Sequence, residues 1–212
     1  MKPQSPTWAR GLRAYTECHL GTTTEFLPRD SLQALITEEN VRSEMGIQDG
    51  IWARKFRPQK YLADLNLVKT VVEEAMAVFA ILVVLGRSQF TKALLIDEGL
   101  RDEHLPLSID HEHSICLSHD GQKIFMFVNW PEESLTEFVN YKQWFYLAPV
   151  LKAHGEVMKL HEKRPLPFIE DDGDPARGGG GLVYKARVHP AHQEGFEVHI
   201  YSLVLIFPRG MH

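Results

Sequence analysis

The chain has 212 residues, of which 44% are hydrophobic and 24% are charged. This balance is typical of a globular protein and too apolar for a wholly disordered one. The formal net charge of −5, without any basic stripe interleaved with aromatic residues, argues against a nucleic-acid partner. Cys18 and Cys116 are too few for a disulfide framework, and the N-terminus lacks the apolar core of a signal peptide. We therefore expect an intracellular protein, cytoplasmic or nuclear.

The N-terminal two thirds of the chain has the hydrophobic spacing of helices. Asp30 is expected to cap a helix over residues 31–36, and Thr37 to cap a second helix with acidic residues in its first turn. A longer amphipathic helix is expected from about Leu65 to Leu85, ending at the helix-terminating Gly86.

The stretch from Ala75 to Gly86 is the most apolar part of the chain. A membrane-spanning helix needs about 20 apolar residues, and this stretch is shorter. It also continues a helix that carries Glu73 and Glu74. We interpret it as a helix buried in a core, and we expect no membrane partner.

A third helix is expected from about Ser88 to Asp97, ending at Gly99. After Leu105 the pattern changes. Residues 113–118 and 123–128 flank Asp120-Gly121, a dipeptide typical of two-residue hairpin turns. Helical spacing returns over residues 132–146 and is ended by Pro149.

Charged residues, proline and glycine dominate from Lys159 to Arg177, which predicts a linker between two domains. The expected domains are a helical N-terminal region over residues 1–158, the linker over 159–177, and a β-rich part over 178–212. The fold class that follows is α+β: a helical region with a small β-hairpin, then an incomplete β-sheet.

A run of four glycines, Gly178, Gly179, Gly180 and Gly181, leads into an alternating strand from Leu182 to Val188. The strand places Val183 on its otherwise polar face, next to the glycines. An isolated apolar residue there would suit a flat aromatic ligand, although any strand tolerates one by chance. A flexible linker or a tight turn is the alternative for the glycines themselves.

These residues resemble the glycine-rich loop and second strand of the protein-kinase N-lobe, in which the pattern is G-x-G-x-x-G-x-V. Further segments over residues 26–196 look like the helical N-terminal region and the loop flanks of a group of fungal kinase-domain proteins. They are Phe26-Leu27-Pro28, residues 38–42, Phe79-Ala80-Ile81-Leu82, residues 98–107, residues 143–150, residues 166–170 and His189-Pro190-Ala191-His192.

The resemblance implies a truncated kinase-like N-lobe whose loop folds over the phosphates of ATP. Gly178 and Gly181 match the second and third glycines of the loop, and Val183 would rest on the adenine. The first glycine position is Ala176, a departure from the pattern. ATP is therefore the one cofactor that the resemblance suggests, bound through Gly178, Gly179, Gly180, Gly181 and Val183.

Catalytic residues do not accompany the loop. Phosphoryl transfer by this family needs a lysine on the third strand, a catalytic-loop aspartate and a metal-binding aspartate. The sequence has no lysine after Lys185 and no H-R-D or D-F-G string. We therefore expect no kinase activity from the chain as written and no catalytic residues. Residues 197–212 depart from the family pattern, and we interpret them as an altered reading of the gene or a decayed end.

Two other clusters offer chemistry. Residues 111–119 are rich in histidine and contain Cys116, but they lack an established zinc spacing. The acids Glu170, Asp171, Asp172 and Asp174 lack the spacing of a calcium loop, and a solvated charge run is the expectation. We predict no metal site, and we expect His189 and His192 to mark a surface turn.

Two functions from different classes remain. The first is a protein-kinase-like fragment, catalytically incompetent, that binds ATP weakly at the glycine-rich loop. The second is a non-enzymatic interaction or regulatory module, in which the helical region binds a protein partner and the β part is vestigial. The aromatic residues Trp130, Trp144, Phe145 and Tyr146 could supply a contact surface, but on amphipathic helices such residues are more often core.

Overall fold

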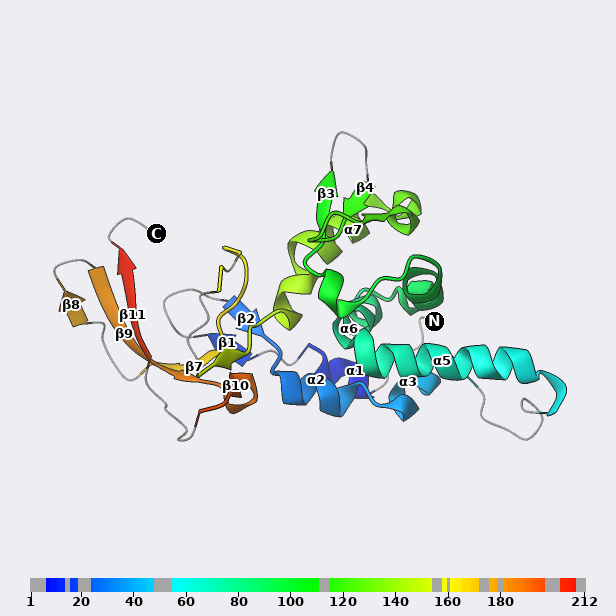
Figure 1. Cartoon of the computed structure of the whole chain (residues 1–212), viewed down its shortest axis with the longest axis horizontal. Coiled ribbons are helices and arrows are strands. Elements are labelled where there is room, and N and C mark those ends of the chain that lie inside the picture. Colours follow the sequence, from blue (N-terminus) through cyan, green and yellow to red (C-terminus); the bar gives the residue numbers. More distant parts are fainter. Residues whose placement is uncertain are drawn as a thin grey trace. The chain divides into compact units, whose positions relative to one another are not determined.

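The computed structural model describes residues 7–13, 16–18, 24–47, 55–110, 115–153, 158–159, 161–171, 176–178, 181–196 and 203–208. The fold is α+β, as expected. The chain forms two compact units, which we describe separately (Figure 1). Unit 1 comprises residues 1–14 and 30–143, and unit 2 comprises residues 15–29 and 144–212.

Unit 1 is mainly helical. Its α-helices are α1 (Thr7–Gly11), α2 (Arg29–Leu35), α3 (Glu38–Glu44), α5 (Pro58–Glu74), α6 (Met76–Val84) and α7 (Glu132–Asn140). Its shorter helical segments are η1 (Ser88–Phe90), the π-helical η2 (Ala93–Asp97), η3 (Asp102–His104), η4 (Phe125–Asn129) and η5 (Lys142–Tyr146), which continues into unit 2. A three-stranded antiparallel sheet is formed by β3 (Ser108–Asp110), β4 (Ile115–Leu117) and β5 (Lys123–Ile124).

The predicted start of α3 is confirmed. Thr37 Oγ1 accepts a hydrogen bond from the backbone N–H of Asn40 at 3.2 Å, which satisfies one of the free donors of the first turn. Helix α2 begins at Arg29, slightly earlier than the sequence predicts, so Asp30 lies in its first turn and not at the cap.

The long helix expected from Leu65 to Leu85 is two helices. The first, α5, begins seven residues earlier than expected, with Pro58 in its first turn, where a missing N–H costs nothing. Ala75, with φ −143° and ψ 36°, separates α5 from α6. The break is stabilised by Asp102, whose carboxylate accepts hydrogen bonds from the N–H groups of Ala77 and Val78 at 3.0 Å each. A capping partner so distant in sequence is invisible to local periodicity.

The end of α6 at Gly86 is confirmed. Gly86 has φ +66°, its N–H bonds to Val83 O at 3.0 Å, and the N–H of Arg87 bonds to Leu82 O at 2.7 Å. This pair of bonds is the Schellman ending, which requires the left-handed conformation that glycine adopts without strain.

The core of unit 1 surrounds α6, as predicted. From Ala77 to Leu82 every residue is buried. A cluster of aromatic rings supplies another part of this core: Phe127 packs against Trp130 at 4.9 Å and against Phe138 at 5.4 Å between ring centroids. Within the part of the chain that the structure describes, no helix combines the length and apolar character of a membrane span.

The turn around Asp120-Gly121 differs from the expected two-residue hairpin. Ser118 N donates to Gln122 O at 2.9 Å, so that three residues form the loop, and Gly121 has φ +89°. A turn ending in a left-handed glycine is the usual three-residue solution. The strand after the turn is also shorter than expected, because η4 begins at Phe125.

Unit 2 is built from short strands. An antiparallel pair joins β1 (Thr16–Cys18) and β2 (Thr24–Phe26), and a parallel pair joins β6 (Leu151–Lys152) and β10 (Gln193–Glu194). The largest sheet has the order β11-β9-β7, and β8 also pairs with β9. These strands are β7 (Phe168–Asp171), β8 (Ala176–Gly178), β9 (Gly181–Val188) and β11 (Leu203–Pro208).

Residues 159–177, expected to be a linker, thus contribute β7 and most of β8 to a sheet. Both strands pair with β9, a partner that the charged and proline-rich composition of this segment does not reveal. The compact units also divide the chain elsewhere, since residues 144–158 belong with the sheet and not with the helical region.

Candidate functional site

The glycine run lies in an antiparallel hairpin of unit 2. Ala176 pairs with Val183, Arg177 with Leu182, and Gly178 with Gly181 (Figure 1). Gly179 and Gly180 connect the last pair along the chain and lie outside the described residues. Of the expected site residues, the structure therefore places Gly178 at the end of β8 and Gly181 and Val183 at the start of β9.

The sheet supports this hairpin from the other edge of β9. Strand β11 runs antiparallel to β9, with Ile206 opposite Val183 and Pro208 opposite Gly181. Strand β9 is consequently paired on both edges along the part that carries the glycine and the valine. The glycine run begins and ends in paired strands, an arrangement that fits a glycine-rich loop and equally the alternative of a tight turn.

Strand β11 beside β9 carries no group that could neutralise a phosphate. Its residues, 203–208, are Leu-Val-Leu-Ile-Phe-Pro. The two strands of the hairpin themselves contain the cationic residues Arg177, Lys185 and Arg187. Backbone N–H groups of the hairpin could also donate to an anion, as in glycine-rich loops that bind phosphate.

His192 is a buried polar residue of unit 2 whose role sequence reasoning missed. The residue is 3% exposed, although a surface turn was expected. Its Nε2 accepts a hydrogen bond from the backbone N–H of Arg29 at 3.1 Å, and its Nδ1 lies 3.0 Å from Pro149 O. Because Nε2 accepts and a carbonyl can only accept, Nδ1 carries the proton and the ring is the neutral tautomer.

Several segments that carry the family resemblance meet around this ring. Phe26 packs edge-on against His192, with 5.4 Å between ring centroids, and against His189 at 6.1 Å. The N–H of His189 donates to Pro167 O at 2.7 Å, and the N–H of Leu27 donates to Phe145 O at 2.8 Å. These motifs therefore share a structural role in holding unit 2 together.

The segment over residues 98–107 has the same role in unit 1. Arg101 bonds through Nε to Glu74 Oε2 at 2.6 Å and through Nη1 to Leu95 O at 2.6 Å and Leu100 O at 2.9 Å. The pKa of Asp102 is raised to about 6, mainly because the carboxyl is buried. Hydrogen bonds from the backbone N–H groups at the start of α6 act in the opposite direction and lower the pKa. Such a carboxyl is engaged in capping a helix and not in chemistry.

Gln143 completes this arrangement. Its side-chain amide is fully buried, accepts from Leu107 N at 2.7 Å and donates to Leu107 O at 2.9 Å. The same Nε2 also donates to Val139 O. The amide thus links Leu107, the residue before β3, to Val139 in α7.

The other candidate clusters do not assemble a reactive site. Burial raises the pKa of the Cys116 thiol to about 12, which makes this cysteine a poor nucleophile. His119 is exposed, and residues 111–114 lie outside the described residues. Glu170 and Asp171 lie in β7, whereas Asp172 and Asp174 are not described. Within the described ranges no group of three histidine, cysteine or acidic side chains could hold a metal ion.

The aromatic residues weighed as a contact surface are largely core, as expected. Trp130, Trp144 and Tyr146 are buried, and the Trp144 ring stacks on His161 at 4.5 Å. Comparison of the chain with known protein families, with curated proteins and with solved structures finds no match.

Proposed function

We propose that this chain is a protein-kinase-like fragment without phosphoryl-transfer activity, which binds ATP weakly through the glycine hairpin of unit 2. The observation that carries the proposal is the pairing of Gly178 with Gly181 inside an antiparallel sheet. A glycine hairpin held in this way can present bare backbone N–H groups to phosphate oxygens, because no Cβ atoms stand in their path.

Weak binding and absence of catalysis follow from the surroundings of the hairpin. A kinase places a lysine on the strand beside the loop and two carboxylate or amide groups on Mg²⁺. Here β11, one of the strands beside β9, is wholly apolar, and the sequence supplies no H-R-D or D-F-G string. With the family's catalytic lysine and metal-binding groups missing, we expect a dissociation constant of about 1 mM, equivalent to about −4 kcal/mol.

Thermal unfolding with Mg-ATP tests the proposal. We expect ATP to raise the melting temperature of the wild-type protein, and Gly181→Asp to abolish the shift, because the new carboxylate would repel phosphate. The matched control is Met158→Asp, which adds the same charge at an exposed residue of unit 2. No shift for the wild-type protein at several times the expected dissociation constant would refute ATP binding, and so would an equal loss in the control variant.

A second candidate function is supported by a separate observation. Unit 1 exposes large apolar side chains, among them Ile96, Phe125 and Val128. The segments that bear them are joined, because Met126 N donates to Glu98 Oε1 at 2.8 Å. Exposed apolar groups on adjoining segments suit a protein-binding module. Two results together would favour this function over the first. ATP does not bind, and the protein self-associates or captures a partner in a way that Phe125→Ser abolishes.

A further inference from the structure

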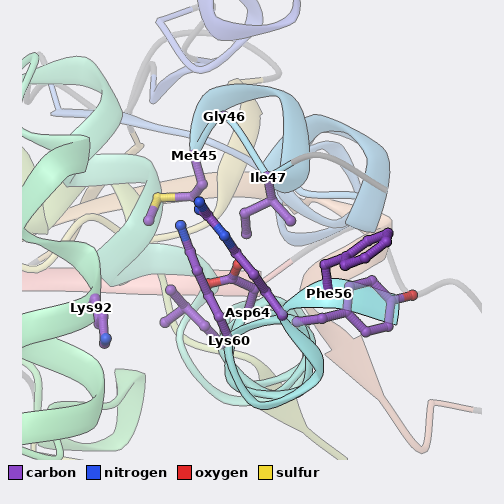
Figure 2. Close-up of a pocket in the computed structure, with 10 residues that line it drawn as sticks. Met45, Gly46, Ile47, Phe56, Lys60, Asp64 and Lys92 are labelled. Atoms are coloured by element: carbon purple, nitrogen blue, oxygen red, sulfur yellow. The ribbon is translucent and has the colours of Figure 1, made fainter. Parts of the chain in front are cut away.

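Unit 1 contains a pocket that none of the motifs described above uses. Its volume is about 690 Å³, within the range of small-molecule sites. The end of α3 supplies Met45, Gly46 and Ile47, the N-terminal half of α5 supplies most of the opposite wall, and Lys92 belongs to a separate helical segment (Figure 2).

The lining combines apolar groups with an excess of positive charge. Leu67 is buried at the pocket, whereas the Phe56 ring is 61% exposed. Three cationic side chains, those of Arg57, Lys60 and Lys92, accompany a single carboxylate, that of Asp64. In Figure 2 the Lys60 side chain extends from α5 toward Met45 and Gly46, along the pocket.

Among the described residues, these cations have no protein partners. Within the described parts of the chain, the side chains of Arg57, Lys60 and Lys92 have no hydrogen bond or ion pair. Elsewhere on the same helix Lys69 does have one, with Glu73 Oε2 at 3.8 Å. The excess positive charge is therefore local to the pocket.

Two of these cations, Arg57 and Lys60, lie at the N-terminal end of α5, where positive charge is unfavourable. Arg57 is the N-cap of α5 and Lys60 lies in its first turn, where no acidic residue is present and no side chain caps the helix. The N-terminus of a helix carries partial positive charge, which disfavours a cation there and favours an anion. A bound anion would relieve this repulsion, and the apolar wall would favour an anion with an organic body.

We propose that this pocket binds a small organic anion, a phosphate or carboxylate attached to an aromatic or aliphatic body. Arg57, Lys60 and Lys92 hold the charged group, and Phe56, with Met45 and Ile47, contacts the body. The proposal is independent of ATP binding by the hairpin, because every residue named here belongs to unit 1.

The test titrates the full chain with 1-naphthyl phosphate and follows the amide signals of ¹⁵N-labelled glycines. We expect saturable binding with the signal of Gly46, which lines the pocket, among those that shift. Two reference probes separate the contributions: 1-naphthol has the body without the charge, and inorganic phosphate has the charge without the body. Both should bind at least about tenfold more weakly, a difference of about 1.4 kcal/mol.

A charge-matched pair of variants locates the site. Lys60→Gln should weaken naphthyl phosphate binding by about tenfold, since a charge-assisted contact is lost. Lys69→Gln, on the same helix but outside the pocket lining, should leave the affinity unchanged. Circular dichroism of each variant checks that α5 is retained.

Three results would overturn the proposal. The first is absence of saturable binding at about 1 mM naphthyl phosphate, a concentration that detects even weak sites. The second is an equal loss of affinity in Lys69→Gln, which would mean general attraction to surface charge. The third is binding that shifts the signals of the glycine run and leaves Gly46 unmoved, which would place the anion at the hairpin.

Discussion

Residues 98–107 of unit 1 and the glycine hairpin of unit 2 are held in the fold in different ways. In residues 98–107 of unit 1, side chains do the structural work: Glu98, Arg101 and Asp102 each bond to backbone groups of other segments. In the glycine hairpin of unit 2, the described residues of β8 and β9 are held by strand pairing. The difference teaches that polar side chains can fix a segment through bonds to remote backbone groups, whereas strand pairing fixes the hairpin through the backbone of adjacent strands.

The largest expected effect on stability is that of replacing His192. Its side chain bonds to backbone groups of other segments in unit 2, as the side chains of residues 98–107 do in unit 1. His192→Ala should lower the free energy of unfolding by about 4 kcal/mol, because it leaves a cavity and two backbone groups without their partner. Urea denaturation measures the loss. The exposed His119 is the control, and His119→Ala should change stability by less than about 0.5 kcal/mol. A small loss for His192→Ala would mean that this histidine is free for a functional role.

The pH dependence of the free energy of unfolding tests the role of the buried Asp102 carboxyl in unit 1. Its pKa is raised from 3.8 to about 6 in the folded protein, so the folded state binds more protons than the unfolded state between these values. Stability should therefore fall as the pH rises through that window, by no more than about 3 kcal/mol at 1.36 kcal/mol for each pH unit.

Unfolding of wild-type protein and Asp102→Asn across this pH range isolates the effect. The asparagine keeps a carbonyl oxygen for the N–H groups of α6 but does not titrate. The difference between the two free energies of unfolding should change with pH in the direction given. A difference that is constant from about pH 4 to pH 7 would contradict burial of the carboxyl as the cause of its raised pKa.

Gln143 is expected to have an intermediate effect. Gln143→Ala should destabilise unit 1 by about 2 kcal/mol, because the backbone N–H and C=O of Leu107 lose their buried partners. Gln89 is exposed, and Gln89→Ala provides the matched control. Equal midpoints of urea denaturation for the two variants would argue that the hydrogen bonds between Gln143 and Leu107 do not stabilise unit 1.

Gly86 should give the smallest effect. Gly86→Ala forces a side chain into φ +66° and should cost about 1 kcal/mol. Asparagine tolerates this conformation better, so Gly86→Asn should cost less. Thermal denaturation of the pair tests the order, and a more stable alanine variant would contradict the left-handed ending of α6.

The sequence predicts features whose causes are local. The cap at Thr37, the end of α6 at Gly86, the buried character of α6 and the extent of β9 all follow from neighbouring residues. The break at Ala75 could not be predicted, because the carboxylate that stabilises it comes from Asp102. Pro58, by contrast, was a readable signal for the earlier start of α5.

The same distinction applies to the candidate sites. The glycine run and the strand after it were predicted from adjacent residues, but the pairing of β9 with β11 joins segments that share no local pattern. His192 looks like part of a surface turn because its burial depends on Phe26 and Pro149, both remote in the chain. Arg57 and Lys92 likewise meet at one pocket only through the fold.

The most direct test of the central claim is a titration of the ¹⁵N-glycine-labelled protein with Mg-ATP. The chain has 15 glycines, so the spectrum is simple enough to assign by single substitutions. We predict saturable shifts in the amide signals of Gly178 to Gly181, with the signals of Gly86 and Gly99 in unit 1 unchanged. Unmoved signals from the glycine run at saturating ATP, or shifts confined to glycines of unit 1, would contradict the claim that the hairpin is a phosphate site.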